Sequence, residues 1–170
     1  MLGSMLYKRL VADDRYEVLG TVRNSDVNDH FDEIERRGLI YGVDVLDSDG
    51  LVSLLNDIKP SVVINCVGLI KQESTADDPL KVLPLNALLP HRLTKLCELM
   101  GARVVHISTD CVYSGKVGSY TEESISDSVD LYGKSKFIGE VVDSHAAITL
   151  RTSIVGHELS SRKSLVDWFL

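Results

Sequence analysis

The chain has 170 residues, of which 44% are hydrophobic and 25% are charged, and its formal net charge is −7. This length suits one domain with a real core, and this composition argues against intrinsic disorder. The negative charge disfavours nucleic acid as a partner, because binding to such a polyanion depends mainly on lysine and arginine.

Localisation signals and cysteines point to a reduced, non-membrane environment. No apolar stretch approaches the length of a transmembrane helix, and residues 1–10 lack the apolar core of a signal peptide. The cysteines Cys66, Cys97 and Cys111 lie far apart and lack zinc-site spacing, so we expect reduced thiols and no metal. We therefore expect a cytoplasmic protein with no membrane partner.

The first part of the chain alternates between helical and β-rich patterns. Residues 3–12 carry apolar side chains near helical spacing, and the runs at 16–22 and 37–45 are typical of strands. Residues 48–57 again show helical spacing. The continuous apolar run at 61–68 predicts a strand that is buried on both faces.

The second part continues the alternation. Residues 85–101 predict a helix that stops at Gly101, and the apolar runs at 102–109 and 146–153 predict two further strands. Between them, residues 110–131 form a long Ser-, Asp- and Gly-rich segment, and a loop of that length is usually functional. Alternation of this kind predicts βαβ units and a parallel sheet with helices on both faces.

Both ends of the chain are unusual for a complete α/β protein. The chain opens directly in a helical pattern with no strand before it, and it stops within the amphipathic stretch at 164–170. We therefore expect an internal fragment of a longer reading frame.

A tyrosine and a lysine, Tyr132 and Lys136, lie four residues apart in what reads as the start of a helix. Positions i and i+4 share a helix face, so an ammonium there would lower the phenol's pKa from about 10 toward neutrality. A tyrosine so tuned can give or take a proton at a carbonyl or alcohol oxygen. Taken alone, the spacing is more typical of an ordinary polar helix end than of a proton-transfer pair.

Polar residues follow the apolar strand at 102–109. Ser108, Thr109 and Asp110 lie where that strand ends, and parallel α/β sheets bind ligands at the carboxyl ends of their strands. A hydroxyl at this edge could hydrogen-bond the same substrate oxygen as Tyr132. A polar loop start or a helix N-cap is the alternative interpretation.

Asn86 lies four residues before Pro90. Proline has no N–H and crowds the carbonyl at i−4, so the carbonyl of Asn86 should lose its helical partner. This predicts a helix kink with a free acceptor that could hold a water. The alternative is that Pro90 marks a late helix start.

Three motifs, STD at 108–110, YGKSKFIGE at 132–140 and LRTS at 150–153, carry a family resemblance that extends over essentially all 170 residues. They resemble the extended short-chain dehydrogenase/reductase family, most closely the dTDP-4-dehydrorhamnose reductase-like branch, which reduces 4-keto nucleotide sugars. The resemblance implies an α/β, Rossmann-like, doubly wound parallel sheet, an NAD(P) cofactor and a nucleotide-sugar substrate. A homodimer of the full-length protein is left open.

The resemblance also implies roles for individual residues. Thr109 would be the hydroxyl of the catalytic set, Tyr132 the acid, and Lys136 its tuner and the anchor of the cofactor ribose. Asn86 matches the asparagine of the family's helix kink. The strand end that lines the nicotinamide side is matched by Asn65, Cys66, Val67 and Gly68.

The chain departs from the family pattern at its start. The family begins with a strand and a GxxGxxG turn that holds the pyrophosphate, but only Gly3 matches a glycine of that turn. We therefore expect residues 1–170 to be a partial NAD(P)-binding domain that has lost the first, central strand and most of the substrate domain. The strands at 16–22 and 61–67 would then close on each other or be partly disordered, rather than remain as two half-sheets. We expect such a chain alone to bind NADP(H) poorly and to turn over no substrate.

The cofactor type is predicted from the end of the strand at 16–22, which corresponds to the second strand of the family. Arg23 stands first after that strand, and a guanidinium suits the 2′-phosphate of NADP. Asp26 is close enough to keep NAD open. Asp44 and Val45, after the next strand, resemble the family's contact with the adenine.

These motifs lead us to expect NADP(H)-dependent reduction of a keto-sugar nucleotide. An epimerase or dehydratase of the same family is the first alternative, because dehydratases often have an acidic residue at the position of Asp110. The second alternative is a non-catalytic, cofactor-binding regulatory subunit that resembles the methionine adenosyltransferase β subunit.

Overall fold

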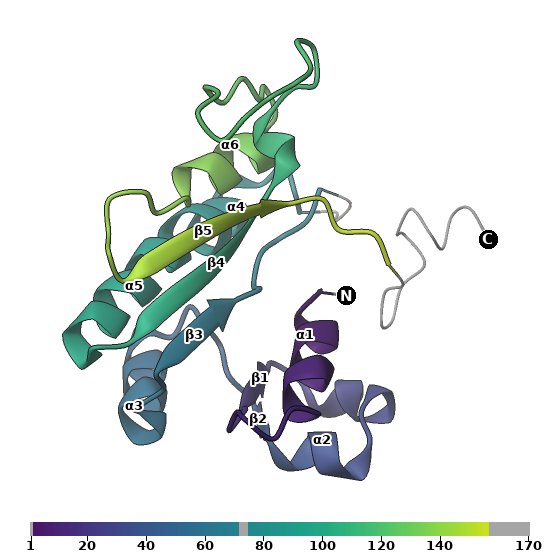
Figure 1. Cartoon of the computed structure of the whole chain (residues 1–170), viewed down its shortest axis with the longest axis vertical. Coiled ribbons are helices and arrows are strands. Elements are labelled where there is room, and N and C mark those ends of the chain that lie inside the picture. The colour runs from purple at the N-terminus through teal and green to yellow at the C-terminus, as the bar shows by residue number, and fades with distance from the viewer. Residues whose placement is uncertain (1, 72–74, 157–170) are drawn as a thin grey trace. The chain divides into compact units, whose positions relative to one another are not determined.

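The computed structural model describes residues 2–71 and 75–156. They form a mixed α/β structure with parallel strands, as expected (Figure 1). The chain divides into two units, Met1–Leu51 with Ile154–Leu170 and Val52–Ser153, and each is described by itself. Within the described ranges, no helix is both long and apolar enough to cross a bilayer.

The first unit contains a two-stranded sheet and short helices. Its elements are α1 (Leu2–Val11), β1 (Gly20–Val22), a 3-10 helix (Ser25–His30), α2 (Glu33–Arg37) and β2 (Leu39–Tyr41). Strands β1 and β2 are parallel. A small core of Tyr7, Phe31 and Leu39 holds them together, with the two rings edge to face at 5.7 Å.

The second unit contains a three-stranded parallel sheet in the order β3–β4–β5, preceded by α3, which runs into it from the first unit. Its elements are α3 (Ser48–Ile58), β3 (Val62–Asn65), α4 (Pro79–Val82), a π-helix (Leu83–Leu88), α5 (Leu89–Met100), β4 (Arg103–Thr109), a 3-10 helix (Asp110–Val112), α6 (Leu131–Ile138) and β5 (Ala147–Thr152). Figure 1 shows α4, α5 and α6 along one side of this sheet.

The helices end and bend where the sequence predicts. Gly101 adopts a left-handed conformation (φ 69°), and its N–H bonds to carbonyls of the last turn of α5. The stretch before α5 is a π-helix, and Pro90 stands just after it. Wider π turns commonly appear where the regular ladder is interrupted, so the predicted irregularity at Asn86 is confirmed.

Strand β4 presents alternate side chains to the helices. Val104, His106 and Ser108 are buried, and α5 and α6 both contact this strand. The buried cluster under α5 includes Cys97, which is a free thiol, as are the two half-buried cysteines of the described residues.

The expectation that the strand at 61–68 is buried on both faces is wrong. Val62 is 43% exposed and Ile64 39%, and on β5 of the same sheet Ile148 is 54% exposed and Leu150 40%. Within the described part of the second unit, α4, α5 and α6 lie along one face of the sheet only. A continuous apolar run shows that both faces of a strand are hydrophobic. It does not show that a helix packs against each face.

The closure expected between the strands at 16–22 and 61–67 is also wrong. Among the described residues, β1 pairs only with β2 and β3 only with β4, so two separate sheets form. β1 has three residues and β3 has four, so a ladder between them would offer few hydrogen bonds. Those bonds would have to offset the entropy lost in ordering the intervening chain.

Gly139 is essential for the contact between the end of α6 and the π-helix. A Cβ atom at this position would lie 2.0 Å from the carbonyl oxygen of Asn86, which is backbone and cannot move aside. We expect Gly139→Ala to lower the free energy of unfolding by about 1–3 kcal/mol, the usual cost of overpacking. Urea denaturation followed by circular dichroism measures this.

Gly50→Ala serves as the control. The Cβ there would meet the end of the Asp47 side chain, which can rotate away. Equal losses in the two variants would show that the backbone approach at Gly139 is not the reason for the glycine.

Candidate functional site

Helix α6 carries Tyr132 and Lys136 and is capped at its start by Asp130. One carboxylate oxygen of Asp130 accepts from the N–H of Gly133 at 2.8 Å, and the other accepts from Lys71 at 2.8 Å. Lys71 belongs to the segment after β3, so this ion pair joins that segment to the helix start. Tyr132 is half-buried and Lys136 is buried.

Lys136 is held against the end of the sheet. Its ammonium donates to the carbonyl of Ile107 on β4 at 2.7 Å. Burial lowers its pKa to about 8, against the opposing effects of the nearby Glu140 carboxylate and the Cys66 thiol. Lys136 is therefore still mainly protonated at neutral pH, but it loses its proton at lower pH than an exposed lysine does.

The pKa of the Tyr132 phenol shifts in the direction opposite to the one we expected. Burial raises the pKa of its phenol above the usual 10.0, and an interaction with the Thr109 hydroxyl opposes that rise only in part. The expected lowering by Lys136 is therefore wrong for this structure, because desolvation of the phenolate dominates. The phenol keeps its proton at neutral pH.

Thr109 is the last residue of β4 and caps the short 3-10 helix that follows. Its hydroxyl accepts from the N–H of Cys111 and donates to the carboxylate of Asp110, both at 3.2 Å. The capping interpretation of this motif is thus confirmed, and the same hydroxyl also faces Tyr132.

Asn86 is fully buried and uses both ends of its amide. The side-chain oxygen accepts from the N–H of Leu69 at 2.8 Å, and the nitrogen donates to the Leu69 carbonyl at 3.0 Å and to the Ser135 hydroxyl at 3.2 Å. Its own carbonyl faces Gly139. Asn86 therefore fastens the segment after β3 to α6.

The end of β3 lies beside Asn86 and Lys136. A Cβ atom on Gly68 would lie 3.1 Å from the Asn86 amide oxygen and 3.8 Å from the Lys136 nitrogen. Burial raises the pKa of the Cys66 thiol, and Lys136 opposes that rise. Val67 contributes its N–H to the side-chain oxygen of Asn65 at 3.1 Å.

His106 is a buried titratable residue that the sequence reasoning missed. The Asn65 side-chain nitrogen lies 3.1 Å from its Nδ1, and because the Asn65 oxygen is held by the Val67 N–H, Nδ1 must accept. The imidazole proton is then on Nε2, which is buried and has no partner among the described residues. Burial, with the positive field of Lys136, lowers the pKa of His106 to about 3.

The predicted residues of the first unit lie at strand ends and in α1. Arg23 follows β1, and its guanidinium lies 3.8 Å from the carboxylate of Asp44 after β2, with both side chains exposed. Asp44 also accepts from the N–H of Leu46 at 2.9 Å. Val45 is half-buried, and Gly3 lies in the first turn of α1.

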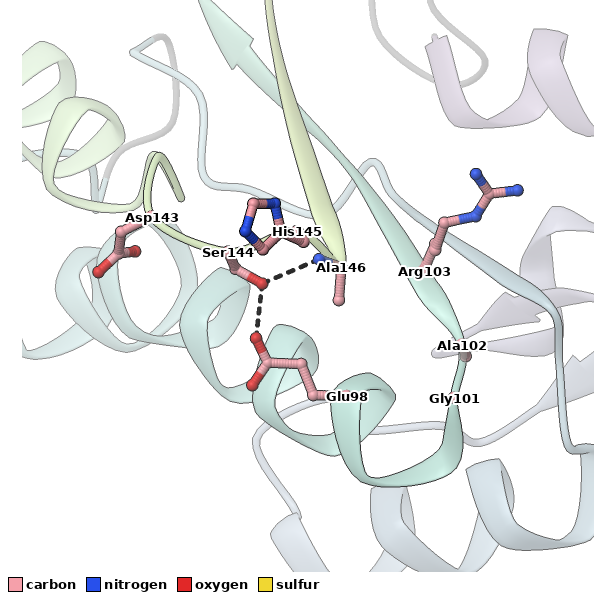
Figure 2. Close-up of a pocket in the computed structure, with 8 residues that line it drawn as sticks. All are labelled: Glu98, Gly101, Ala102, Arg103, Asp143, Ser144, His145 and Ala146. Carbon is pink, nitrogen blue, oxygen red and sulfur yellow. Dashed lines mark hydrogen bonds between the residues drawn. The ribbon is translucent and has the colours of Figure 1, made fainter.

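A hollow of about 450 Å³ lies at the opposite, amino edge of the second unit's sheet. Figure 2 shows it between the end of α5 and the start of β5, where the Ser144 hydroxyl donates to Glu98. Asp143, His145 and Arg103 contribute to its wall. Because the predicted residues gather at the carboxyl edge, this hollow is not the candidate site.

The buried neutral state of His106 predicts a specific pH dependence of stability. His106 is neutral when folded down to about pH 3 but takes up a proton near pH 6.5 when unfolded, so stability falls as the pH falls through this window. One proton corresponds to about 1.4 kcal/mol per pH unit, or about 2 kcal/mol between pH 6.5 and pH 5.0.

We expect the chain to lose about 2 kcal/mol more of its free energy of unfolding than His106→Gln over that interval. Glutamine does not titrate and keeps an acceptor for Asn65. Urea denaturation at the two pH values measures the difference, and parallel losses would mean that His106 is protonated normally in the folded state.

Comparison with known proteins identifies the family. The family model described as "RmlD substrate binding domain" matches residues 1–169. A dTDP-4-dehydrorhamnose reductase from Aggregatibacter actinomycetemcomitans is 30% identical over 156 residues, which cover 89% of this chain and 47% of that protein. The β subunit of methionine adenosyltransferase 2 from Rattus norvegicus is 34% identical over 98 residues, covering 58% of this chain and 29% of that protein.

Solved structures show the same fold. The Bordetella bronchiseptica enzyme WbmG, solved with NAD and UDP, superposes with a TM-score of 0.73 at 21% identity over 89% of this chain and 49% of its own. A dTDP-4-dehydrorhamnose reductase from Bacillus anthracis, solved with NADP, gives 0.55 at 21% identity over 70% of this chain and 45% of its own. The chain thus spans half or less of the length of these proteins. On the match of residues 1–169, it belongs to the dTDP-4-dehydrorhamnose reductase-like, RmlD substrate binding domain family.

Proposed function

We propose that this chain is the cofactor-binding part of an NADP(H)-dependent reductase that acts on the keto group of a sugar nucleotide. The observation that carries the proposal is the meeting of three groups at the carboxyl edge of the second unit's sheet. These are the Thr109 hydroxyl beside Tyr132, the buried ammonium of Lys136, and the open backbone at Gly68. This edge is where parallel α/β sheets bind ligands.

Tyr132 would act as the acid. When bound, a reduced nicotinamide supplies a hydride to the carbonyl carbon of a substrate. Tyr132 would donate its phenolic proton to the carbonyl oxygen, and its raised pKa keeps that proton in place at neutral pH. Thr109, which faces the phenol, would share the hydrogen bonding of the same oxygen.

Lys136 would hold the ribose of the nicotinamide half. Among the described residues, the Ile107 carbonyl uses one of the three N–H groups of the ammonium, which leaves two of them for hydroxyl oxygens. Gly68 would let a cofactor approach the backbone, because this residue is exposed and has no side chain. Asn65, Cys66 and Val67 lead the chain into this position.

Residues of the first unit would serve the adenosine half. The exposed Arg23 guanidinium, whose contact to Asp44 is a long 3.8 Å, is open to a 2′-phosphate and thereby favours NADP over NAD. Asp44 and Val45 would contact the adenine, and Gly3 would be the last glycine of the pyrophosphate-binding turn, the one that lets helix and strand pack closely. The NADP and NAD found in the two solved relatives support a dinucleotide of either kind.

Two alternatives have specific support. The acidic Asp110 directly after Thr109 is the pattern of dehydratases of the same family, although the reductase branch has it too. The 34% identity to the methionine adenosyltransferase 2 β subunit favours a regulatory, cofactor-binding role.

Turnover separates these functions. The test uses the longest protein of the reading frame that contains this chain, with NADPH and dTDP-4-keto-6-deoxy sugars. Oxidation of NADPH with formation of a 4-hydroxy sugar supports the reductase. Sugar conversion without net NADPH loss supports the epimerase or dehydratase, and cofactor binding with no conversion supports the regulatory subunit.

Tyr132→Phe should lower turnover in that protein about 100- to 10,000-fold, the usual contribution of one proton-transfer group. Cofactor affinity should stay nearly unchanged, because the hydroxyl acts on the transition state while the ring only fills space. Lys136→Ala should weaken both turnover and cofactor affinity. Steady-state kinetics and calorimetric titration measure the two quantities, and wild-type turnover in Tyr132→Phe would remove the tyrosine from the mechanism.

Arg23→Ala should lower affinity for NADPH and leave affinity for NADH nearly unchanged, because only NADPH carries the 2′-phosphate. Arg15→Ala is the matched control, since Arg15 is an exposed arginine of the same unit that pairs with Asp13 at 2.6 Å. Parallel calorimetric titrations with both cofactors measure the effect. A loss of equal size for NADH would show that Arg23 does not read the phosphate.

A further inference from the structure

A buried ion pair joins three chain segments next to the candidate site. Glu140, just after α6, accepts from the Ser108 hydroxyl of β4 at 2.7 Å with one carboxylate oxygen. Arg151 of β5 donates to the same oxygen at 2.9 Å and to the second oxygen at 2.7 Å. The Glu140 side chain is only 2% exposed. Three hydrogen bonds thus hold this carboxylate, and the two from the guanidinium form a two-pronged contact.

A buried ion pair is weak evidence of stabilisation, because removing both charges from water costs about as much as their attraction returns. A well-packed apolar pair could hold the same elements together. The presence of Glu140 and Arg151 in this position therefore calls for another reason, and their neighbours supply it.

The Glu140 end of the pair lies next to the candidate site and affects the charge of Lys136. Glu140 lies one helical turn after Lys136, and its carboxylate is the largest influence that favours the charged form of that lysine against burial. Ser108, which binds Glu140, directly precedes Thr109 in β4. The pair thus touches the strand and the helix that carry the proposed acid and its partners.

The Arg151 end of the pair contacts the β4–α6 loop, residues 113–130. The second arm of Arg151 donates to the Tyr113 hydroxyl and, at 3.2 Å, to the Glu122 carbonyl, and its guanidinium lies 5.1 Å from the centre of the Tyr113 ring. Tyr113 stacks on Tyr120 at 4.4 Å. Asp127 closes the loop on itself by accepting from Tyr120 at 2.9 Å.

We propose that Glu140 and Arg151 are positioning residues that couple the order of the β4–α6 loop to the charge state of Lys136. This inference rests on the proposed role of Lys136. A loop that leaves the carboxyl edge of the sheet is placed to meet substrate, so an ordered loop and a correctly charged lysine would occur together. A pair with a purely structural role would change stability without this coupling.

The first arm of the test follows the titration of Lys136 by NMR of the chain with labelled lysine side chains. Glu140→Gln should shift that titration to lower pH, because the favourable charge is lost. Glu98→Gln removes the same charge from a surface site, where Glu98 pairs with Lys95, and should leave the titration in place. An unchanged titration in Glu140→Gln overturns the proposal.

The second arm follows hydrogen exchange of three loop amides that are bonded in the structure, those of Ser114, Thr121 and Ser128. A lysine in the Arg151→Lys variant cannot make both hydrogen bonds to Glu140 and also contact Tyr113. The three amides should therefore exchange about tenfold faster or more, as expected when hydrogen bonds to charged groups are lost. Arg103→Lys, an exposed arginine at the start of β4, is the control.

The decisive result is the cross-effect. Glu140→Gln should also accelerate exchange in the β4–α6 loop, because Arg151 loses its anchor, and a change confined to Lys136 would refute the coupling. If circular dichroism shows that this variant does not fold, Glu140→Asp, which keeps the charge but withdraws it by one methylene, should give smaller shifts of both readouts. No measurement uses cofactor or substrate, so a protein without reductase activity can still show the coupling, and an active one can lack it.

Discussion

The burial of one ammonium group, that of Lys136, constrains the architecture of the second unit. A charge removed from water is costly unless the protein supplies acceptors and an opposite charge. Here the Ile107 carbonyl accepts a hydrogen bond from the ammonium, and Glu140 provides the negative charge. Because Glu140 is itself buried, it in turn requires Arg151 and Ser108. Burying Lys136 thus requires polar partners on both β4 and β5. This explains why buried polar side chains gather around α6.

The same helix is brought close to its neighbours by small residues and by Asn86. Gly139 lets the helix end approach the backbone of the π-helix, and the Asn86 side chain bonds to the segment after β3 and to Ser135 in α6. The wider π turn places this asparagine where a regular helix would not. Geometry at the carboxyl edge therefore depends on a distortion that Pro90 helps to create, since proline cannot donate to the preceding turn.

The strength of sequence reasoning differed between these features for physical reasons. Continuous apolar runs and a glycine stop predicted β3, β4 and the end of α5, since hydrophobicity and left-handed conformations are local properties. Helical geometry likewise predicted that Tyr132 and Lys136, four residues apart, lie on one face of a helix. The direction of the Tyr132 pKa could not be predicted, because desolvation depends on packing by distant segments. His106 was missed because a single polar residue inside an apolar run has no periodic signature.

Helix α6 has only eight residues and contains Gly133, so it is too short and too poor in helix-forming residues to persist by itself. Its stability must come from contacts with partners distant in sequence, such as Cys111, whose carbonyl lies against Gly133. Such an element forms only after the chain between those partners has been ordered, which costs loop entropy. The proposed catalytic tyrosine and lysine would accordingly be among the last residues to reach native geometry during folding, and among the first to leave it when the domain opens.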